Sequence, residues 1–367
     1  MYNVLLVLNF SNSFEGSFIR SVKALSDEIE KDSGKVVYLL PEESKGTDWV
    51  GDLDGASSPV FYFKNSLAGL YQNTKKIKKI IKEYNINIIH SHFADYRQHL
   101  PIALARTGNK NIDYIVHSHR EPVVRNHLYD KLAAFVTNAT LYIAVSESIK
   151  NKLSINGRRA VTLLNGVDFS RLELSDPTVK KSDYKTDGYT QNILMFGYDF
   201  EEKGVDFVIK TLTDYDPEHK FRLLIAVSEN VDEATKAVRE ACGEVPDWIK
   251  LLPARNDVAT YYKLADVFIL ANRHEGSPYT MIECAYMGIP IIFCDVPGHD
   301  ELGIPWTVKV NHNDSAGLYK AMCEIFGEDS QDSYSMGLES KKYVTDNFSL
   351  GTWVYEVMNI YSNIHRI

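Results

Sequence analysis

Two glutamates with seven residues between them are the side chains in this sequence best suited to bind a polar ligand. Glu275 and Glu283 lie in the stretch NRHEGSPYTMIECAYMG, which runs from Asn272 to Gly288. The preceding run, ADVFILA, has the length and β-branched content of a buried parallel strand. Because carboxylates accept hydrogen bonds from hydroxyl groups, the pair suits a ligand rich in hydroxyls.

A short helix is predicted to begin just after the first of these glutamates. Ser277 occupies an N-cap position, Pro278 the first helical position and Gly288 the position after the helix, which we expect from 278 to 287. The free N–H groups of such a helix start, together with its dipole, favour a bound anion such as phosphate. The residues expected around that anion are Gly276, Ser277, Pro278, Tyr279 and Thr280.

Phosphate at the helix start and hydroxyls on the two glutamates together describe a nucleotide sugar. The run LADVFILANRHEGSPYTMIECAYMGIPIIFCDVPGHDEL, residues 264–302, resembles the donor-site segment of the large retaining GT-B family of glycosyltransferases, family 4. This resemblance implies that Glu283 binds ribose hydroxyls and that Glu275 lies near the transferred sugar.

The resemblance also implies an α/β fold of the GT-B type, with two Rossmann-like domains facing each other across a cleft. We expect an acceptor-side domain at residues 1–170, a linker at 171–190 and a nucleotide-sugar-binding domain at 191–348. The last amphipathic segment, 349–367, is expected to be a helix that crosses back onto the first domain. A length of 367 residues fits two domains of ordinary size.

Composition excludes several classes of protein. Hydrophobic residues make up 44% and charged residues 24% of the chain, as in soluble globular proteins. A net charge of −9 argues against binding nucleic acid through a positive surface. The four cysteines form no C-x-x-C pair, and no G-x-G-x-x-G or P-loop is present. The start MYNVLLVLNF lacks the basic region of a signal peptide, so we expect a first strand there and a cytoplasmic protein.

Two predicted strands end in histidine pairs, IIHSH with His90 and His92, and DYIVHSH with His117 and His119. Alternate residues of a strand share a face, so a metal-dependent hydrolase that uses these four histidines is one alternative. No carboxylate falls at a ligand spacing beside either pair, and we therefore expect no metal. By resemblance to family 4, His119 faces the transferred sugar, and the end of a parallel strand is where open α/β sheets bind ligands.

Further donor contacts are implied by the resemblance. Lys203, in EEKGVDF, takes the position that pairs with the donor diphosphate, while Gly16 lies in the turn that approaches the phosphates. Arg255 falls in the turn that passes over the nucleobase. Tyr198 replaces the arginine expected beside Gly197, so the family's second phosphate cation is missing, and Arg273 is a candidate to replace it.

The acceptor side carries positive charge. Arg120 and Arg125 follow the second histidine pair, in a loop suited to an anionic acceptor such as a pyrophosphate-linked lipid. The predicted helix over 66–84 has an apolar face and a face with five lysines. Such a face is either solvated or docks on an anionic membrane surface, and both interpretations stay open.

These observations predict a retaining glycosyltransferase of the hexosyltransferase class that needs no metal or other cofactor. The expected donor is a UDP-linked sugar and the expected acceptor a glycan or lipid-linked molecule, as in cell-surface polysaccharide synthesis. Such an enzyme would act in the cytoplasm, with peripheral contact at the inner face of the membrane. A metal-dependent hydrolase and a non-catalytic GT-B-like nucleotide-binding protein are the alternatives.

Overall fold

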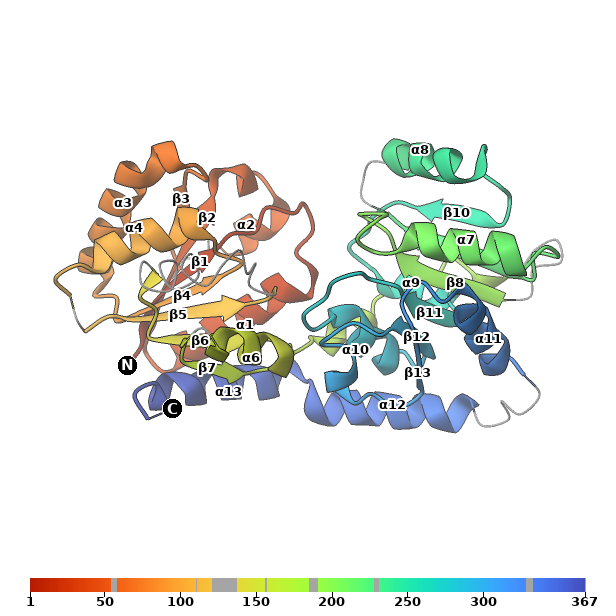
Figure 1. Ribbon diagram of the computed structural model, residues 1–367. Coiled ribbons are helices and arrows are strands. Elements are labelled where there is room, and N and C mark those ends of the chain that lie inside the picture. The colour runs from red at the N-terminus through yellow and green to blue at the C-terminus, as the bar shows by residue number, and fades with distance from the viewer. Residues whose placement is uncertain are drawn as a thin grey trace. The chain divides into compact units, whose positions relative to one another are not determined.

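The computed structural model describes residues 1–53, 58–109, 111–120, 137–155, 157–184, 191–227, 231–327 and 333–366. The chain divides into two compact units, one formed by Met1–Gly166 with Leu350–Ile367 and the other by Val167–Ser349. Each unit contains a parallel β-sheet packed with helices (Figure 1).

The first unit contains a seven-stranded sheet with the strand order β3-β2-β1-β4-β5-β6-β7, in which all pairings are parallel. Its strands are β1 (Asn3–Leu8), β2 (Lys35–Pro41), β3 (Val60–Phe63), β4 (Ile88–His92), β5 (Asp113–Ser118), β6 (Leu141–Ala144) and β7 (Ala160–Thr162). Its helices are α1 (Gly16–Lys31), α2 (Asp48–Leu53), α3 (Leu70–Tyr84), α4 (Tyr96–Arg106), α6 (Glu147–Ile155) and α13 (Leu350–Asn363).

The second unit contains a six-stranded parallel sheet with the order β10-β9-β8-β11-β12-β13. Its strands are β8 (Gln191–Phe196), β9 (Phe221–Ala226), β10 (Ile249–Leu252), β11 (Val267–Leu270), β12 (Ile291–Cys294) and β13 (Thr307–Val310). Its helices are α7 (Val205–Tyr215), α8 (Val231–Cys242), α9 (Ala259–Leu264), α10 (Tyr279–Tyr286), α11 (Ser315–Ile325) and α12 (Ser333–Asn347).

Strands β1 and β11 are apolar along almost their whole length because helices cover both faces of a parallel sheet. Residues 4–8 of β1 are at most 1% exposed, and all four residues of β11 are buried. Each such aliphatic side chain contributes about 1.5–3 kcal/mol by leaving water. The two units have separate hydrophobic cores, so each sheet is a rigid frame for the loops that follow its strands.

Helix α13 belongs to the first unit although it comes last in the sequence. It packs against α1, and the Tyr2 hydroxyl lies 2.9 Å from that of Ser362. Both chain ends accordingly appear on the same unit in Figure 1. The packing also carries Tyr361 to His90, whose Nδ1 lies 2.8 Å from the tyrosine hydroxyl.

The stretch expected as a linker, 171–190, makes specific contacts with the second unit in its described part. The N–H of Asp176 donates to Thr260 Oγ1 at 2.8 Å. Lys181 Nζ lies 2.6 Å from Asp266 Oδ1. The described residues of this stretch thus belong to the second unit. Within the residues that the structure describes, no helix combines the length and apolar character needed to cross a membrane.

Candidate active site

Helix α10 begins one residue later than the sequence predicts. Pro278 is the N-cap, with φ −74° and ψ 115°, rather than the first helical residue, and Ser277 precedes the cap. The extended ψ of the proline delays the first helical turn. Gly288 follows the helix as predicted: its φ is +69°, and its N–H donates to the carbonyl of Ala285 at 3.1 Å. The sequence 276–280 therefore does surround a helix start.

Lys203 and Glu275 form an ion pair beside that helix start. Lys203 Nζ lies 3.3 Å from Oε2 of Glu275. The same Oε2 accepts a hydrogen bond from Asn272 Nδ2 at 2.7 Å, and Oε1 accepts one from the N–H of Gly276 at 3.1 Å. Three donors from two loops therefore fix the position of this carboxylate.

The contact between these loops depends on a glycine. Gly204, next to Lys203, has φ +65° and caps α7. A Cβ added there would lie 2.2 Å from the carbonyl oxygen of Ala271. Any side chain at residue 204 would therefore clash with that oxygen. Glycine alone permits both this left-handed conformation and this close approach. The approach places Lys203, which follows β8, against the loop that follows β11.

The Lys203 ammonium is buried but stays charged. Burial lowers the pKa of this group, but the carboxylate of Glu275 and the ring of Tyr198 outweigh that effect, so the pKa of Lys203 is raised overall. Nζ lies 4.7 Å from the centre of the Tyr198 ring, in a cation–π contact. Tyr198, which stands where an arginine was expected, therefore contacts Lys203 through its ring.

Glu283 is almost fully buried, and its two oxygens already have partners. Oε1 accepts a hydrogen bond from Arg171 Nη1 at 2.6 Å, while Oε2 accepts one from the hydroxyl of Tyr262. Burial and the Glu283 carboxylate raise the pKa of Tyr262 well above its usual value. Any ribose hydroxyl bound by Glu283 would share the carboxylate with both partners.

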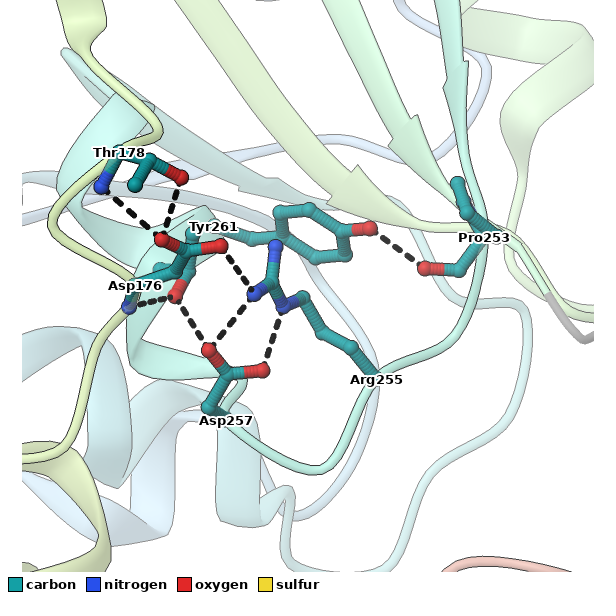
Figure 2. Close-up of polar contacts among 7 residues, drawn as sticks. Asp176, Thr178, Pro253, Arg255, Asp257 and Tyr261 are labelled. Carbon is teal, nitrogen blue, oxygen red and sulfur yellow. Dashed lines mark hydrogen bonds and ion pairs between the residues drawn. The ribbon is translucent and has the colours of Figure 1, made fainter.

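Arg255 is bound to two carboxylates, as Figure 2 shows. Its Nη2 donates to Asp257 at 2.7 Å and to Asp176 at 3.4 Å, and its guanidinium lies 5.3 Å from the centre of the Tyr261 ring. These contacts join the stretch around 176 to the turn after β10. Arg255, which was expected near the nucleobase, therefore links two segments of the second unit through its ion pairs.

Arg273 is likewise engaged with a carboxylate. Its two terminal nitrogens donate to Asp206 of α7 at 3.0 and 2.7 Å, and it also contacts the carbonyl of Glu201. Asp206 raises the pKa of Arg273 despite partial burial. To replace the missing arginine at the phosphates, Arg273 would have to leave this paired geometry.

The four histidines of the two H-x-H pairs form one cluster at the ends of β4 and β5. His92 Nδ1 lies 3.0 Å from His119 Nε2, and His117 Nδ1 lies 3.3 Å from His90 Nε2. Because parallel strands end at the same edge of a sheet, the register that pairs His92 with His117 brings both H-x-H pairs together. Burial lowers the pKa of all four rings, and that of His117 to about 3, so the cluster is uncharged at neutral pH.

A metal would have to compete with hydrogen bonds inside this cluster. The three residues His90, His92 and His117 offer nitrogens within 4.8 Å of one another. Both nitrogens of His90 are hydrogen-bonded, and His92 and His117 each keep only Nε2 without a partner among the described residues. These two nitrogens are fewer than the three protein ligands typical of catalytic zinc sites, so a metal would have to replace hydrogen bonds between the rings.

Family models match both halves of the chain. A model described as "Glycosyltransferase Family 4" matches residues 20–171, and one described as "Glycosyl transferases group 1" matches residues 190–328. The chain belongs to the family 4, group 1 glycosyltransferases. This result confirms the resemblance found in the sequence and does not favour the metal-dependent hydrolase.

Individual relatives agree with the family and the fold. An uncharacterized glycosyltransferase of Haemophilus influenzae is 27% identical over 240 residues, which are 62% of this chain and 63% of the relative. The alpha-monoglucosyldiacylglycerol synthase of Streptococcus pneumoniae is 25% identical over 74% of this chain and 66% of its own length. The chain thus matches somewhat less than two thirds of each relative's length.

The fold of this chain is similar to that of a solved structure. Anabaena HepE in complex with UDP superimposes with a TM-score of 0.77 at 16% identity, over 98% of this chain and all of that one. The GT-B fold, with two parallel-sheet α/β domains, is therefore confirmed.

The remaining predicted residues of the family 4 chain lie in the first unit. Gly16 is the first residue of α1, with φ +58°, and an added Cβ would meet no described atom within 4 Å. Arg120 is exposed just after His119. Arg125 lies outside the described residues.

Sequence reasoning missed the residues that hold the predicted ones in place. Asn272 fixes Glu275, and Arg171 with Tyr262 fixes Glu283. Asn272 could have been predicted from its position after a buried strand, because polar residues at the end of a parallel strand contact ligands or the residues that bind them. Arg171 had no local signal, because its partner is 112 residues away.

Phe93 holds a strained backbone beside His119. Its φ is +54°, which is unusual for an aromatic residue, and its ring stacks on that of His119 with 4.1 Å between centres. Asn9 Nδ2 donates to the Phe93 carbonyl at 3.1 Å. Strain of this kind persists where surrounding contacts determine the conformation.

We expect the variant Phe93→Gly to be more stable than Phe93→Ala by about 1 kcal/mol, because alanine keeps the left-handed strain that glycine relieves. Chemical denaturation of both variants measures this difference. The matched control is Leu104 on the exposed part of α4, where glycine should be the less stable choice by about 0.5–1 kcal/mol. If the alanine variant were the more stable one at both positions, Phe93 would not be strained.

Proposed function

We propose that this protein transfers a hexosyl group from a UDP-sugar to an acceptor hydroxyl, with retention at the anomeric carbon. The observation that carries the proposal is the Lys203–Glu275 pair beside the start of α10. It combines a buried cation, a carboxylate and the positive end of a helix dipole, which suit a diphosphate and a sugar. The UDP complex of HepE supports the choice of base for this chain.

In the proposed donor complex, the diphosphate replaces Glu275 as the main partner of Lys203. Lys203 and the N–H groups of residues 279 and 280 at the helix start then stabilise the negative charge that grows on the leaving diphosphate. Glu275, released from Lys203 but still bound by Asn272 and the Gly276 N–H, accepts hydrogen bonds from sugar hydroxyls. The ion pair thus keeps both groups in place before the donor binds.

The reaction at the sugar uses a neutral His119 and no metal. An uncharged imidazole does not repel the positive character that develops at the anomeric carbon, as a charged one would. The leaving phosphate is proposed to take the acceptor proton, so no side-chain base is required.

A lipid-linked or glycan acceptor at the inner membrane surface is part of the proposal. Lysines 75, 78, 79 and 82 of α3 are exposed, and Leu67 just before the helix and Tyr71 in its first turn are 56% and 76% exposed. Basic residues with exposed apolar neighbours suit the surface of an anionic membrane. The pneumococcal relative is named for a glucosylated diacylglycerol, which supports an acceptor of this class.

A thermal-shift screen in EDTA with UDP, ADP, GDP, UMP and UDP-hexoses tests the donor site. UDP at about 100 times its Kd should add about 2.7 kcal/mol of stability and raise Tm by roughly 5–10 °C. UMP is the control, because it lacks the second phosphate that Lys203 is proposed to bind. The best UDP-hexose should then be consumed in EDTA, with retention visible by NMR in the product.

Three outcomes would contradict the proposal in different ways. Equal stabilisation by UMP and UDP would remove the role of the diphosphate site. Binding without turnover on any acceptor would favour the non-catalytic nucleotide-binding alternative. Turnover that EDTA abolishes and a divalent metal restores would show that the reaction is not metal-independent.

A further inference from the structure

A buried histidine lies beside the Lys203–Glu275 pair, in a turn near the end of the donor-like run to which no role has yet been given. His299 follows β12 and is only 1% exposed. Its Nδ1 lies 2.9 Å from the carbonyl oxygen of Cys294, and its ring packs edge-on against Phe293 with 5.7 Å between centres. Backbone and aromatic contacts together fix the orientation of the imidazole.

These contacts also fix where the imidazole proton lies. A carbonyl oxygen can only accept, so Nδ1 carries the hydrogen and Nε2 keeps a bare lone pair in the neutral ring. Burial lowers the pKa of His299, which favours the neutral form. Nε2 is buried and has no hydrogen-bond partner among the described residues. An unpaired buried acceptor is unfavourable, and a ligand that donates a hydrogen bond would satisfy it.

The turn that carries His299 rests directly on the loop that carries Glu275. A Cβ at Gly298 would lie 2.1 Å from the carbonyl oxygen of Gly276 and 3.4 Å from that of Glu275. The two backbones can approach this closely only because residue 298 is glycine, at φ +97°. His299 also lies within electrostatic reach of both the Glu275 carboxylate and the Lys203 ammonium.

An imidazole nitrogen with a lone pair can bind only a part of the donor molecule that donates a hydrogen bond. A diphosphate has only acceptor oxygens, so it gains nothing from a second acceptor. A sugar hydroxyl donates, and the sugar is the part of the donor that is proposed to lie at Glu275. We infer that Nε2 of His299 accepts a hydrogen bond from one hydroxyl of the transferred sugar, which makes His299 a specificity-determining residue. This inference rests on the proposed function.

Two substitutions of His299 distinguish the proposed role of Nε2, which accepts a hydrogen bond from the sugar, from the structural role of Nδ1, which donates to Cys294. His299→Asn can keep an N–H to Cys294 but has no group at the position of Nε2, whereas His299→Gln can place its amide oxygen there. The probes are UDP, the UDP-hexose that stabilises the wild type best, and the monodeoxy analogues of that donor. Thermal unfolding of each variant checks the fold.

The Asn variant is expected to lose about 10- to 100-fold in kcat/KM for the intact donor, as for a lost hydrogen bond in a buried site. One monodeoxy donor should be equally poor with the wild type and with this variant, because neither complex can form the bond. The Gln variant should recover part of the loss. Stabilisation by UDP alone should not change, because UDP carries no transferred sugar.

Three results would contradict this inference. A fully active Asn variant would mean that Nε2 holds only a buried water, and would overturn the inference while leaving the proposed function intact. An equal loss with every monodeoxy donor, or a parallel loss of UDP binding, would assign His299 a structural role. A wild type that neither binds UDP nor consumes any UDP-hexose would overturn the proposed function and this inference with it.

Discussion

Replacing Lys203 by methionine is expected to lower kcat about 100- to 1,000-fold, the range typical of removing one preorganised group that stabilises developing charge. Lys203 is 9% exposed, so water compensates little for the loss of its ammonium group. The Glu275 carboxylate should stay in place in this variant, because Asn272 and the Gly276 N–H still donate to it. Steady-state kinetics with the best UDP-hexose measures the effect.

The control is Lys203→Arg, which keeps the charge on a different stem and should retain more activity than methionine. A loss confined to KM would show that Lys203 binds the ground state and the transition state equally. Unchanged kinetics in the methionine variant, together with an unchanged fold, would remove Lys203 from the site.

Replacing Glu283 by alanine is expected to destabilise the second unit by about 3–5 kcal/mol, as when one partner of a buried ion pair is removed. The Arg171 side chain is 11% exposed and would lose its carboxylate partner, as would the hydroxyl of Tyr262. Urea unfolding should show this loss as a lower midpoint. The same variant should also bind UDP more weakly, because a ribose partner is lost.

A double-mutant cycle separates the ion pair from the donor contact. Arg171→Met combined with Glu283→Met removes both charges, so it should be more stable than Glu283→Ala alone. UDP stabilisation should stay weak in the double variant, since the carboxylate is still absent. Recovery of both stability and UDP binding would mean that Glu283 serves only the fold.

Local sequence patterns were sufficient for the strand, turn and helix around Glu275. The apolar run before Asn272 is β11, and the glycine after the short helix does take the left-handed conformation that ends α10. Such patterns are readable because a buried parallel strand must be continuously apolar and because few residues other than glycine tolerate a positive φ. The start of α10 was off by one residue, since a proline fits equally well as cap or as first residue.

The partners of the charged groups could not be predicted from the sequence. Arg255 and Arg273 were expected at the donor, and the structure pairs them with aspartates. The two H-x-H motifs allowed a metal interpretation, and the register of β4 with β5 turned most of their nitrogens toward one another. A side chain's partner depends on strand order and on distances across loops, which local spacing does not contain.

By itself, the sequence determined the two α/β halves, the strand, turn and helix around Glu275, and the family of the chain. Only the tertiary structure decided that Lys203 meets Glu275, that Arg171 neutralises Glu283 and that His299 lies against the same loop. For Lys203 and His299 the physical reason lies in two close backbone approaches, Gly204 on Ala271 and Gly298 on Gly276. Each brings together segments far apart in the chain because a missing Cβ leaves room for a carbonyl oxygen.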